Sequence, residues 1–236
     1  MEYEGHTLRH ELKYYINYDV CHVLRKRLQR VIQMDENMPD EDGYLISSIY
    51  FDDMYHSAVE EKISGTRFRK KFRIRSYERD NQLIRLECKA KYNEYISKSS
   101  AKLSLEEYIQ IMSGNYDNLV RRKEQVCQEL FCYSKTKLMR PVVVVEYRRE
   151  AYVLPLGNVR ITFDKDISAS TGTLDMFSNE YHTTKVLPED ILVLEVKYDD
   201  YIPSHILSLL QTAKADRCAV SKYVMCREGK RMVKFT

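Results

Sequence analysis

The sequence lacks the features that direct a chain into or across a membrane. No stretch approaches the roughly 20 apolar residues that a membrane-spanning helix requires. Residues 1–5, MEYEG, have neither the basic start nor the apolar core of a signal peptide. The six cysteines form no C-x-x-C pair and no zinc-ligand spacing with the histidines. We therefore expect a cytoplasmic protein with free thiols and no membrane span.

Internal repeats and low-complexity segments are absent as well. The chain has 236 residues, of which 44% are hydrophobic and 31% are charged. These shares are typical of soluble globular proteins, and a chain of this length can bury a sizeable core. We therefore predict a single domain over residues 1–236.

The positive charge is concentrated in one part of the sequence. The net charge of the whole chain is only +3, yet residues 62–91 carry eleven Lys or Arg against three acids. This segment alone is therefore +8, and the rest of the chain is −5. Such asymmetry indicates an anionic ligand or partner more firmly than the modest overall charge does.

Residues 66–79 alternate between cations and apolar side chains. Phe68, Phe72 and Ile74 fall on even positions. The odd positions carry the cations Arg67, Arg69, Lys71, Arg73, Arg75 and Arg79. Because successive side chains of a strand point to opposite faces, the pattern predicts a strand with one basic and one apolar face. The basic face is either an ordinary solvated surface or part of a concave surface that binds a polyanion.

The same pattern recurs along the chain, and it favours the second interpretation. The seven predicted strands cover residues 8–16, 43–53, 66–79, 83–91, 142–152, 159–164 and 191–198. Six of these strands place at least one cation opposite an apolar face. A hairpin turn is predicted at Asp80-Asn81.

Helices and loops are predicted between these strands. The predicted helices cover residues 18–34, 53–63, 104–112, 117–134 and 203–213. Asn17 is the predicted N-cap of the first helix, and Ser104 and Glu107 form the predicted capping box of the third. The acidic residues 35–42 are interpreted as a solvated loop. Residues 168–189 have the weakest pattern and are predicted to form a long loop.

If the strands form one antiparallel sheet whose apolar face is covered by the helices, their charged faces converge on one surface. A closed sheet would turn this surface into a lumen. Burying many like charges without neutralising them is strongly unfavourable, so such a lumen must be wet and filled with anions. Glu11, Glu87 and Glu195 share the cationic faces. They either form salt bridges or hold a divalent metal that bridges to phosphate oxygens.

Eight short motifs in one order resemble a known family. They are Arg9-x-Glu11-x-Lys13-Tyr14 and the segments at 48–52 (SIYFD), 72–75 (FRIR), 86–89 (LECK), 147–152 (YRREAY), 159–161 (VRI), 194–197 (LEVK) and 221–223 (SKY). Together they resemble the polyphosphate polymerase domain of the vacuolar transporter chaperone (VTC) family, within the triphosphate tunnel metalloenzymes. The resemblance implies an α+β fold: an eight-stranded antiparallel β tunnel, closed as a barrel, with helices packed outside. It also implies that the tunnel binds the triphosphate of ATP and a growing polyphosphate.

The resemblance further implies roles for individual residues. The phosphate-binding cations are Lys13, Arg73, Arg75, Lys89, Arg149, Arg160 and Lys222. Ser221 donates a hydrogen bond to phosphate, Lys197 and Glu11 contact the substrate, and Glu195 holds Mn²⁺ or Mg²⁺. Tyr147 matches a tunnel-wall tyrosine, although simple core packing is an equal alternative. No role transfers to Arg67, Arg69 or Lys71.

The predicted activity is the transfer of the γ-phosphate of ATP to a phosphate chain. Hydrolytic relatives begin with an E-x-E-x-K pattern, whereas the first acid is replaced here by Arg9. Fewer carboxylates make a second metal or an activated water harder to arrange, which favours transfer over hydrolysis. The alternatives are a triphosphatase and a non-enzymatic binder of RNA or another polyanion. Only Tyr77 is aromatic among the odd positions of the basic strand, which leaves too few aromatic side chains for bases to stack on and disfavours RNA binding. DNA binding is not expected. The oligomeric state is left open.

Overall fold

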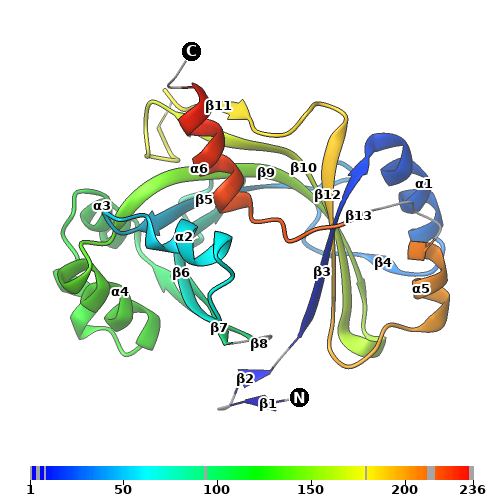
Figure 1. Cartoon of the computed structure of the whole chain (residues 1–236), viewed down its shortest axis with the longest axis horizontal. Coiled ribbons are helices and arrows are strands. Elements are labelled where there is room, and N and C mark those ends of the chain that lie inside the picture. The colour runs from blue at the N-terminus through cyan, green and yellow to red at the C-terminus, as the bar shows by residue number, and fades with distance from the viewer. Residues whose placement is uncertain are drawn as a thin grey trace. The chain divides into compact units, whose positions relative to one another are not determined.

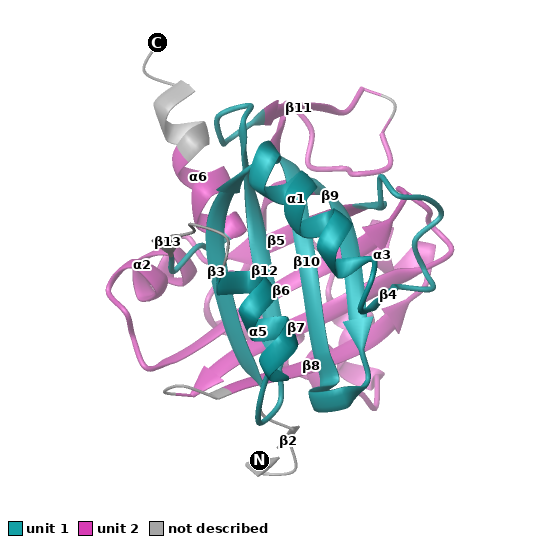
Figure 2. Cartoon of the chain, turned by 90° about the vertical axis from the view of Figure 1, so that its right-hand side faces the viewer, with its two compact units in different colours: residues 1–45, 147–168, 185–221 teal, residues 46–146, 169–184, 222–236 magenta. Residues whose placement is uncertain are grey.

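The chain folds into two compact units, each built from three segments of sequence. The computed structural model describes residues 2–3, 6–7, 9–92, 95–178, 180–211 and 216–233. Unit 1 comprises Met1–Leu45, Tyr147–Ser168 and Lys185–Ser221, and unit 2 comprises Ile46–Glu146, Ala169–Thr184 and Lys222–Thr236 (Figure 2). The prediction of a single domain over residues 1–236 stays a prediction.

The first two described strands form a sheet of their own, and the other 11 form a second sheet; the pairs whose register is described are antiparallel. The bounds of the strands are β1 (Glu2–Tyr3), β2 (His6–Thr7), β3 (His10–Asn17), β4 (Gln33–Met34), β5 (Tyr44–Asp52), β6 (Phe68–Tyr77), β7 (Ile84–Tyr92), β8 (Tyr95–Leu103), β9 (Arg140–Leu154), β10 (Val159–Thr171), β11 (His182–Lys185), β12 (Ile191–Tyr198) and β13 (Asp216–Arg217). The hydrogen-bonded order is β13-β3-β12-β10-β9-β5-β6-β7-β8, with β4 paired to β9 and β11 to β10. Figure 1 labels these elements.

The predicted α+β class with a largely antiparallel sheet is confirmed. The helices are α1 (Tyr18–Leu28), α2 (Ser57–Ile63), α3 (Leu105–Met112), α4 (Gln125–Thr136), α5 (Ser204–Gln211) and α6 (Lys222–Val233), with the 3-10 helices η1 (Asp117–Arg121) and η2 (Leu156–Asn158). Among the described residues, β13 and β8 end the order and no hydrogen bonds join them. The sheet is therefore not closed by hydrogen bonds, in contrast to the closed eight-stranded barrel that was expected.

Unit 1 buries the apolar face of its strands under α1 and α5. Asn17 caps α1 by accepting a hydrogen bond from the Val20 backbone N–H at 2.9 Å, as predicted. Leu24 on α1 and Leu194 on β12 belong to one buried core with Ile206 on α5. Figure 2 shows both helices on one face of the unit 1 strands. Because side chains alternate along β12, its charged residues point to the opposite face.

Unit 2 buries the apolar face of β6, β7 and β8 against α3 and α4. Phe72 and Leu86 share a buried core with Tyr108 of α3 and Leu130 of α4. The predicted capping box is confirmed at the start of α3, where Ser104 and Glu107 cap each other's backbone N–H groups. The cations at odd positions of β6 consequently lie on the face away from this core.

Several element boundaries differ from the sequence predictions. Helix α1 ends at Leu28 rather than near residue 34, because Gln33 and Met34 pair with β9 instead. The helix predicted over residues 117–134 is divided into η1 and α4. The predicted loop at 168–189 contains the end of β10 and all of β11. Residue 8, at the start of the first predicted strand, and residues 212–213, at the end of the last predicted helix, lie outside the described residues.

Strand β8 and helix α6 were not predicted. Strand β8 carries few apolar residues, yet every residue from Tyr95 to Leu103 pairs with β7. Its strand conformation therefore depends on a partner and not on its own hydrophobic pattern.

Candidate functional site

Four neighbouring strands of unit 2 place polar side chains on one face. Tyr50 lies directly opposite Arg73, and Arg73 lies opposite Glu87. Arg75 lies opposite Ser48 on β5. Because residues that face each other in an antiparallel pair share one face, these side chains form rows across the sheet. We call Ser48, Tyr50, Arg73, Arg75, Glu87 and Lys98 the Glu87 cluster.

Three cations share one buried carboxylate in this cluster. Glu87 is only 2% exposed, and its Oε2 atom lies 2.7 Å from Arg73 Nη2 and 3.7 Å from Arg75 Nε. Its Oε1 atom lies 2.6 Å from Lys98 Nζ. Burial alone would raise the pKa of Glu87, but the charges of Arg73, Arg75 and Lys98 outweigh it and hold that pKa far below its usual range. The cluster therefore keeps an excess of positive charge.

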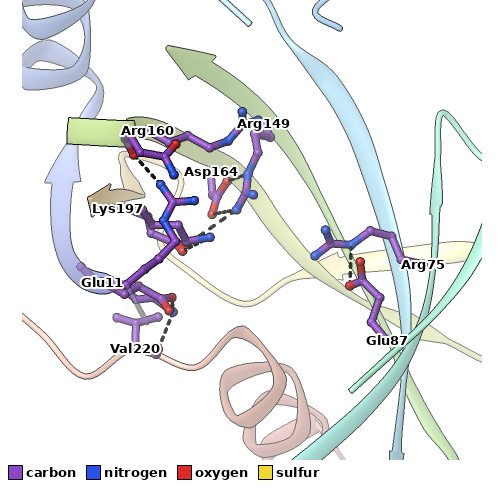
Figure 3. A network of polar contacts seen from close by, with 12 residues as sticks. Glu11, Arg75, Glu87, Arg149, Arg160, Asp164, Lys197 and Val220 are labelled. Atoms are coloured by element: carbon purple, nitrogen blue, oxygen red, sulfur yellow. Dashed lines mark hydrogen bonds and ion pairs between the residues drawn. The ribbon is translucent and has the colours of Figure 1, made fainter. Parts of the chain in front are cut away.

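Two buried polar groups of the Glu87 cluster have unused hydrogen-bonding capacity. The Ser48 hydroxyl and Arg75 Nε lack hydrogen-bond partners among the residues that the structure describes. Ser48 is fully buried and Arg75 is 6% exposed. Figure 3 shows Arg75 pointing toward Glu87. Unsatisfied buried donors are costly, so a ligand that accepts hydrogen bonds would stabilise this arrangement.

Tyr50 adds a hydroxyl to the cluster. Its oxygen accepts a hydrogen bond from Arg73 Nη1 at 3.0 Å. Burial would raise the pKa of Tyr50, but the charges of Arg73, Arg75 and Lys222 lower it. Tyr50, Ser48 and Lys98 were not predicted as site residues. The motif at residues 48–52 contained the signal for the first two, because its alternation places them on one face.

Three further predicted phosphate contacts, Lys89, Lys222 and Ser221, lie on β7 and at the start of α6. Lys89 lies on β7 between Lys71 and Lys98, which face it from the neighbouring strands. Lys222 is the first residue of α6 and is 8% exposed, and Ser221 precedes it.

Unit 1 contains a second group of charged side chains, which we call the Glu195 cluster. Glu195 lies between Thr162 and Lys13 in the pairing of β10, β12 and β3. In the next row on the same face, Lys197 lies between Arg160 and Glu11. The members are Glu11, Lys13, Tyr147, Arg149, Arg160, Thr162, Asp164, Glu195 and Lys197. The Thr162 hydroxyl is buried and lacks a hydrogen-bond partner among the described residues.

Arg149 has the most deeply buried ion pair of this cluster. Its guanidinium donates two hydrogen bonds to Asp164, at 2.6 and 2.8 Å, and its Nη2 atom lies 3.6 Å from Glu195 Oε2 (Figure 3). The guanidinium carbon lies 5.3 Å from the centre of the Tyr147 ring. Burial would lower the pKa of Arg149, but the charge of Asp164 and its other neighbours raise it. Arg149 therefore stays charged in a buried place.

The pKa values of the two lysines of the Glu195 cluster are shifted in opposite directions. Lys13 Nζ lies 2.9 Å from Glu11 and 3.4 Å from the Val220 carbonyl, and Lys197 Nζ lies 2.8 Å from Glu195. Burial would lower the pKa of Lys13, but the carboxylates of Glu195 and Glu11 raise it. For Lys197 burial prevails over its carboxylate neighbours, and its pKa is lowered.

The prediction that the acidic residues 35–42 form a solvated loop is wrong for Asp35, which pairs with Arg160. Residues 35–42 were expected to be solvated, yet Asp35 is 6% exposed and accepts a hydrogen bond from Arg160 Nη2. The same nitrogen lies 3.0 Å from the Tyr44 hydroxyl. Burial opposes ionisation, but hydrogen bonds from Asn37 and the charge of Arg160 lower the pKa of Asp35. The loop thus supplies a counter-ion that no spacing in the sequence indicated.

Arg67, Arg69 and Lys71, for which no role was predicted, differ in their exposure and in their neighbours. Arg67 is exposed, and Arg69 Nη1 donates to the Thr66 carbonyl at 2.6 Å. Lys71 Nζ lies 5.4 Å from the centre of the Tyr223 ring.

The carboxylates of the Glu195 cluster limit how a metal could be held. No three acidic, histidine or cysteine side chains in the described part of the chain are grouped to hold a metal ion by themselves. Each oxygen of Glu195 also faces a cation, Lys197 or Arg149. These residues fit a divalent ion bound by one or two carboxylates together with substrate phosphates, which is a common arrangement for Mg²⁺. They do not fit a cage made of protein ligands alone.

Two solved structures are similar to this chain. A protein from Bacillus halodurans, provisionally assigned as an adenylate cyclase, has a TM-score of 0.50 and 11% identity, over 88% of this chain and 88% of that chain. A protein from Pyrococcus horikoshii OT3 has a TM-score of 0.48 and 15% identity, over 93% of this chain and 98% of that chain. A comparison with curated proteins gave no match. The first likeness shows that this chain shares the fold of that protein.

The family follows from the sequence. The VTC domain model matches residues 8–229, which is almost the whole chain. The chain belongs to the VTC domain family, as its motifs predicted. Within the described ranges, no helix combines the length and hydrophobicity needed to cross a bilayer.

Proposed function

We propose that this VTC-domain chain is a polyphosphate polymerase-like phosphotransferase, which moves the γ-phosphate of ATP onto a phosphate chain with the help of Mn²⁺ or Mg²⁺. The observation that carries this proposal is the Glu87 cluster. Three cations there share one carboxylate, and the buried donors Ser48 Oγ and Arg75 Nε lack hydrogen-bond partners among the described residues. A phosphate oxygen supplies both the negative charge and the hydrogen-bond acceptor that this arrangement needs.

Each cluster, considered by itself, contains cations that suit phosphate. Arginine binds phosphate oxygens in a planar, two-pronged manner, and Arg73, Arg75, Arg149 and Arg160 are proposed to orient the substrate in this way. The remaining proposed phosphate contacts are Lys13, Lys89, Lys197, Lys222 and Ser221. Tyr147 supports Arg149 through its ring.

The proposed reaction needs no protein nucleophile. An oxygen of the terminal phosphate of the chain attacks the γ-phosphorus of ATP and forms a new P–O bond. The bond from that phosphorus to the β,γ-bridging oxygen breaks, and ADP leaves with the electron pair. A divalent ion bound by Glu195 and the phosphates would neutralise charge in the transition state, and Glu11 is the proposed second carboxylate near the substrate.

The position of Arg9 supports transfer over hydrolysis. In the sequence, Arg9 stands where the motif of hydrolytic relatives has its first acid, and its Nε atom lies 2.9 Å from Asp199. The motif thus supplies one carboxylate fewer with which to activate a water molecule.

The test is to incubate the purified chain with ATP and Mn²⁺ or Mg²⁺, and to separate long-chain polyphosphate from free phosphate on a gel. Polymer that grows with time supports the proposal. Free phosphate without polymer would indicate a triphosphatase instead. No ATP turnover with either metal would indicate a non-enzymatic polyanion binder.

Two substitutions connect the activity to the clusters. Arg73→Ala and Glu195→Gln should each abolish turnover, because the first removes a phosphate contact and the second a metal ligand. Arg121→Ala, which removes an exposed cation of η1, is the control and should retain turnover. Circular dichroism checks that each variant is folded. Wild-type rates in a folded Arg73→Ala or Glu195→Gln variant would show that the proposed site is wrong.

A further inference from the structure

Tyr223 and Asp52 form a buried contact between two sequence motifs. Tyr223 follows Lys222 at the start of α6, and Asp52 ends β5 and the motif at residues 48–52. The Tyr223 hydroxyl donates a hydrogen bond to Asp52 Oδ2. Tyr223 is 1% exposed and Asp52 is fully buried. The contact joins residues that are 171 positions apart in the sequence.

Asp52 is itself held in place by the backbone. Its Oδ1 atom accepts hydrogen bonds from the backbone N–H groups of Asp53 and Ala58, both at 2.9 Å. The carboxylate therefore has a fixed orientation, and Oδ2 points to Tyr223. A fixed acceptor of this kind can define the position of the residue that donates to it.

Tyr223 also contacts the Glu87 cluster through Tyr50. The two tyrosine rings are stacked, with centroids 5.1 Å apart and an interplanar angle of 25°. The Tyr50 hydroxyl accepts a hydrogen bond from Arg73 Nη1. A continuous path of contacts thus leads from Asp52 through Tyr223 and Tyr50 to Arg73.

Lys222 directly precedes Tyr223 and is the first residue of α6. It is therefore joined through the backbone to the residue that contacts Asp52 and Tyr50, and only 8% of Lys222 is exposed. A second contact, Arg227 Nη2 to His56 Nδ1 at 2.8 Å, holds the same helix one turn further on. The orientation of α6 therefore determines where the Lys222 side chain lies.

We propose that Asp52 and Tyr223 are positioning residues: their hydrogen bond fixes the first turn of α6 and thereby holds Lys222 in place to bind a phosphate chain. This proposal rests on the proposed function. It gives a role to the motif at residues 48–52 and to the tyrosine of the motif at 221–223. Neither residue is proposed to contact phosphate, because the Tyr223 hydroxyl and both carboxylate oxygens of Asp52 already take part in hydrogen bonds within the protein.

The test measures the binding of inorganic tripolyphosphate by calorimetry. Tyr223→Phe and Asp52→Asn should each weaken binding about tenfold, because an interaction with a charged group is lost. The double variant Tyr223→Phe/Lys222→Ala should bind no more weakly than Lys222→Ala alone, since Tyr223 acts through Lys222. Tyr108→Phe is the matched control. It removes another hydrogen bond between a buried tyrosine and an aspartate in unit 2, that of Tyr108 to Asp175 at 2.8 Å, and should retain wild-type affinity.

Three other outcomes of the binding measurements would overturn the positioning role. Wild-type affinity in folded Tyr223→Phe and Asp52→Asn variants would overturn the positioning role. Independent, additive losses from Tyr223→Phe and Lys222→Ala would show that the hydroxyl acts by another route than Lys222, which also overturns the proposal. If the unsubstituted chain binds no tripolyphosphate, the proposed function itself is wrong and the positioning role is rejected with it.

Discussion

The two clusters differ in how their charged residues are neutralised. Lys13, Arg149 and Lys197 of the Glu195 cluster each lie within 2.9 Å of a carboxylate oxygen. In the Glu87 cluster three cations share the single carboxylate of Glu87. Buried ions lose several kcal/mol of solvation each, and this loss is offset only where counter-charges are close. An anionic ligand should therefore be most strongly favoured at the Glu87 cluster.

Replacing Glu87 by glutamine should destabilise the fold in a pH-dependent manner. The change leaves Arg73, Arg75 and Lys98 without a counter-charge, which should cost about 3 kcal/mol near pH 7. In the folded protein the pKa of Glu87 is held far below its usual range. Its contribution is therefore present above the unfolded pKa of about 4.3, and is lost as the pH falls toward the folded value.

Urea unfolding of both proteins at several pH values measures this effect. The difference in unfolding free energy between wild type and Glu87→Gln should be constant between about pH 6 and 8 and shrink below about pH 4. Glu36→Gln, at an exposed position, is the control and should change stability by less than about 0.5 kcal/mol. A difference that stays the same down to about pH 3 would contradict the assigned ion pairs.

Among the elements, the turn before β5 contacts the strand that presents Arg149. Gly43 has a φ angle of +84°, which favours glycine, and a Cβ atom there would lie 2.0 Å from the Arg149 carbonyl oxygen. Arg148 Nη1 also donates to the Gly43 carbonyl at 3.1 Å. The position of Arg149 on β9 thus depends on a glycine more than 100 residues away in the sequence.

Gly43→Ala should disturb both stability and phosphate binding. The new methyl group must displace the β9 backbone at Arg149, so we expect a loss of unfolding free energy well above 2 kcal/mol and weaker tripolyphosphate binding. Gly65→Ala is the matched control. Gly65 also has a positive φ angle, +73°, but no atom lies within 4 Å of its Cβ position.

Chemical unfolding and calorimetric binding distinguish these two variants. Gly65→Ala should cost only the roughly 1 kcal/mol of the strained backbone and should bind tripolyphosphate normally. Equal stability losses in both variants would show that the close approach at Arg149 is not important.

For the whole molecule, the two units share four of the described strands. Strands β5, β9, β10 and β11 each begin in one unit and end in the other. Unfolding of one unit would therefore remove part of the strands that the other unit needs. We propose on this ground that residues 1–236 behave as one cooperative domain.

Differential scanning calorimetry tests this proposal. We expect a single transition whose calorimetric and van't Hoff enthalpies agree, as for two-state domains. Two separate transitions, or a calorimetric enthalpy well above the van't Hoff value, would show that the units unfold independently.

The sequence by itself determined the faces of the strands and the family. Alternation with a period of two placed Arg73 and Arg75 on one face of β6, because strand geometry fixes that period locally. Local signals also identified the caps of α1 and α3. Local pattern failed for β8, whose strand conformation comes from pairing with β7.

Only the tertiary structure decided which charges neutralise one another. Asp35 is paired with Arg160 across 125 positions, and Asp52 holds Tyr223 across 171 positions. Alternation says which face a side chain occupies, but not which distant loop or helix will cover it. The choice of partner depends on distance in the folded chain, since ion pairs and hydrogen bonds act over only a few ångströms.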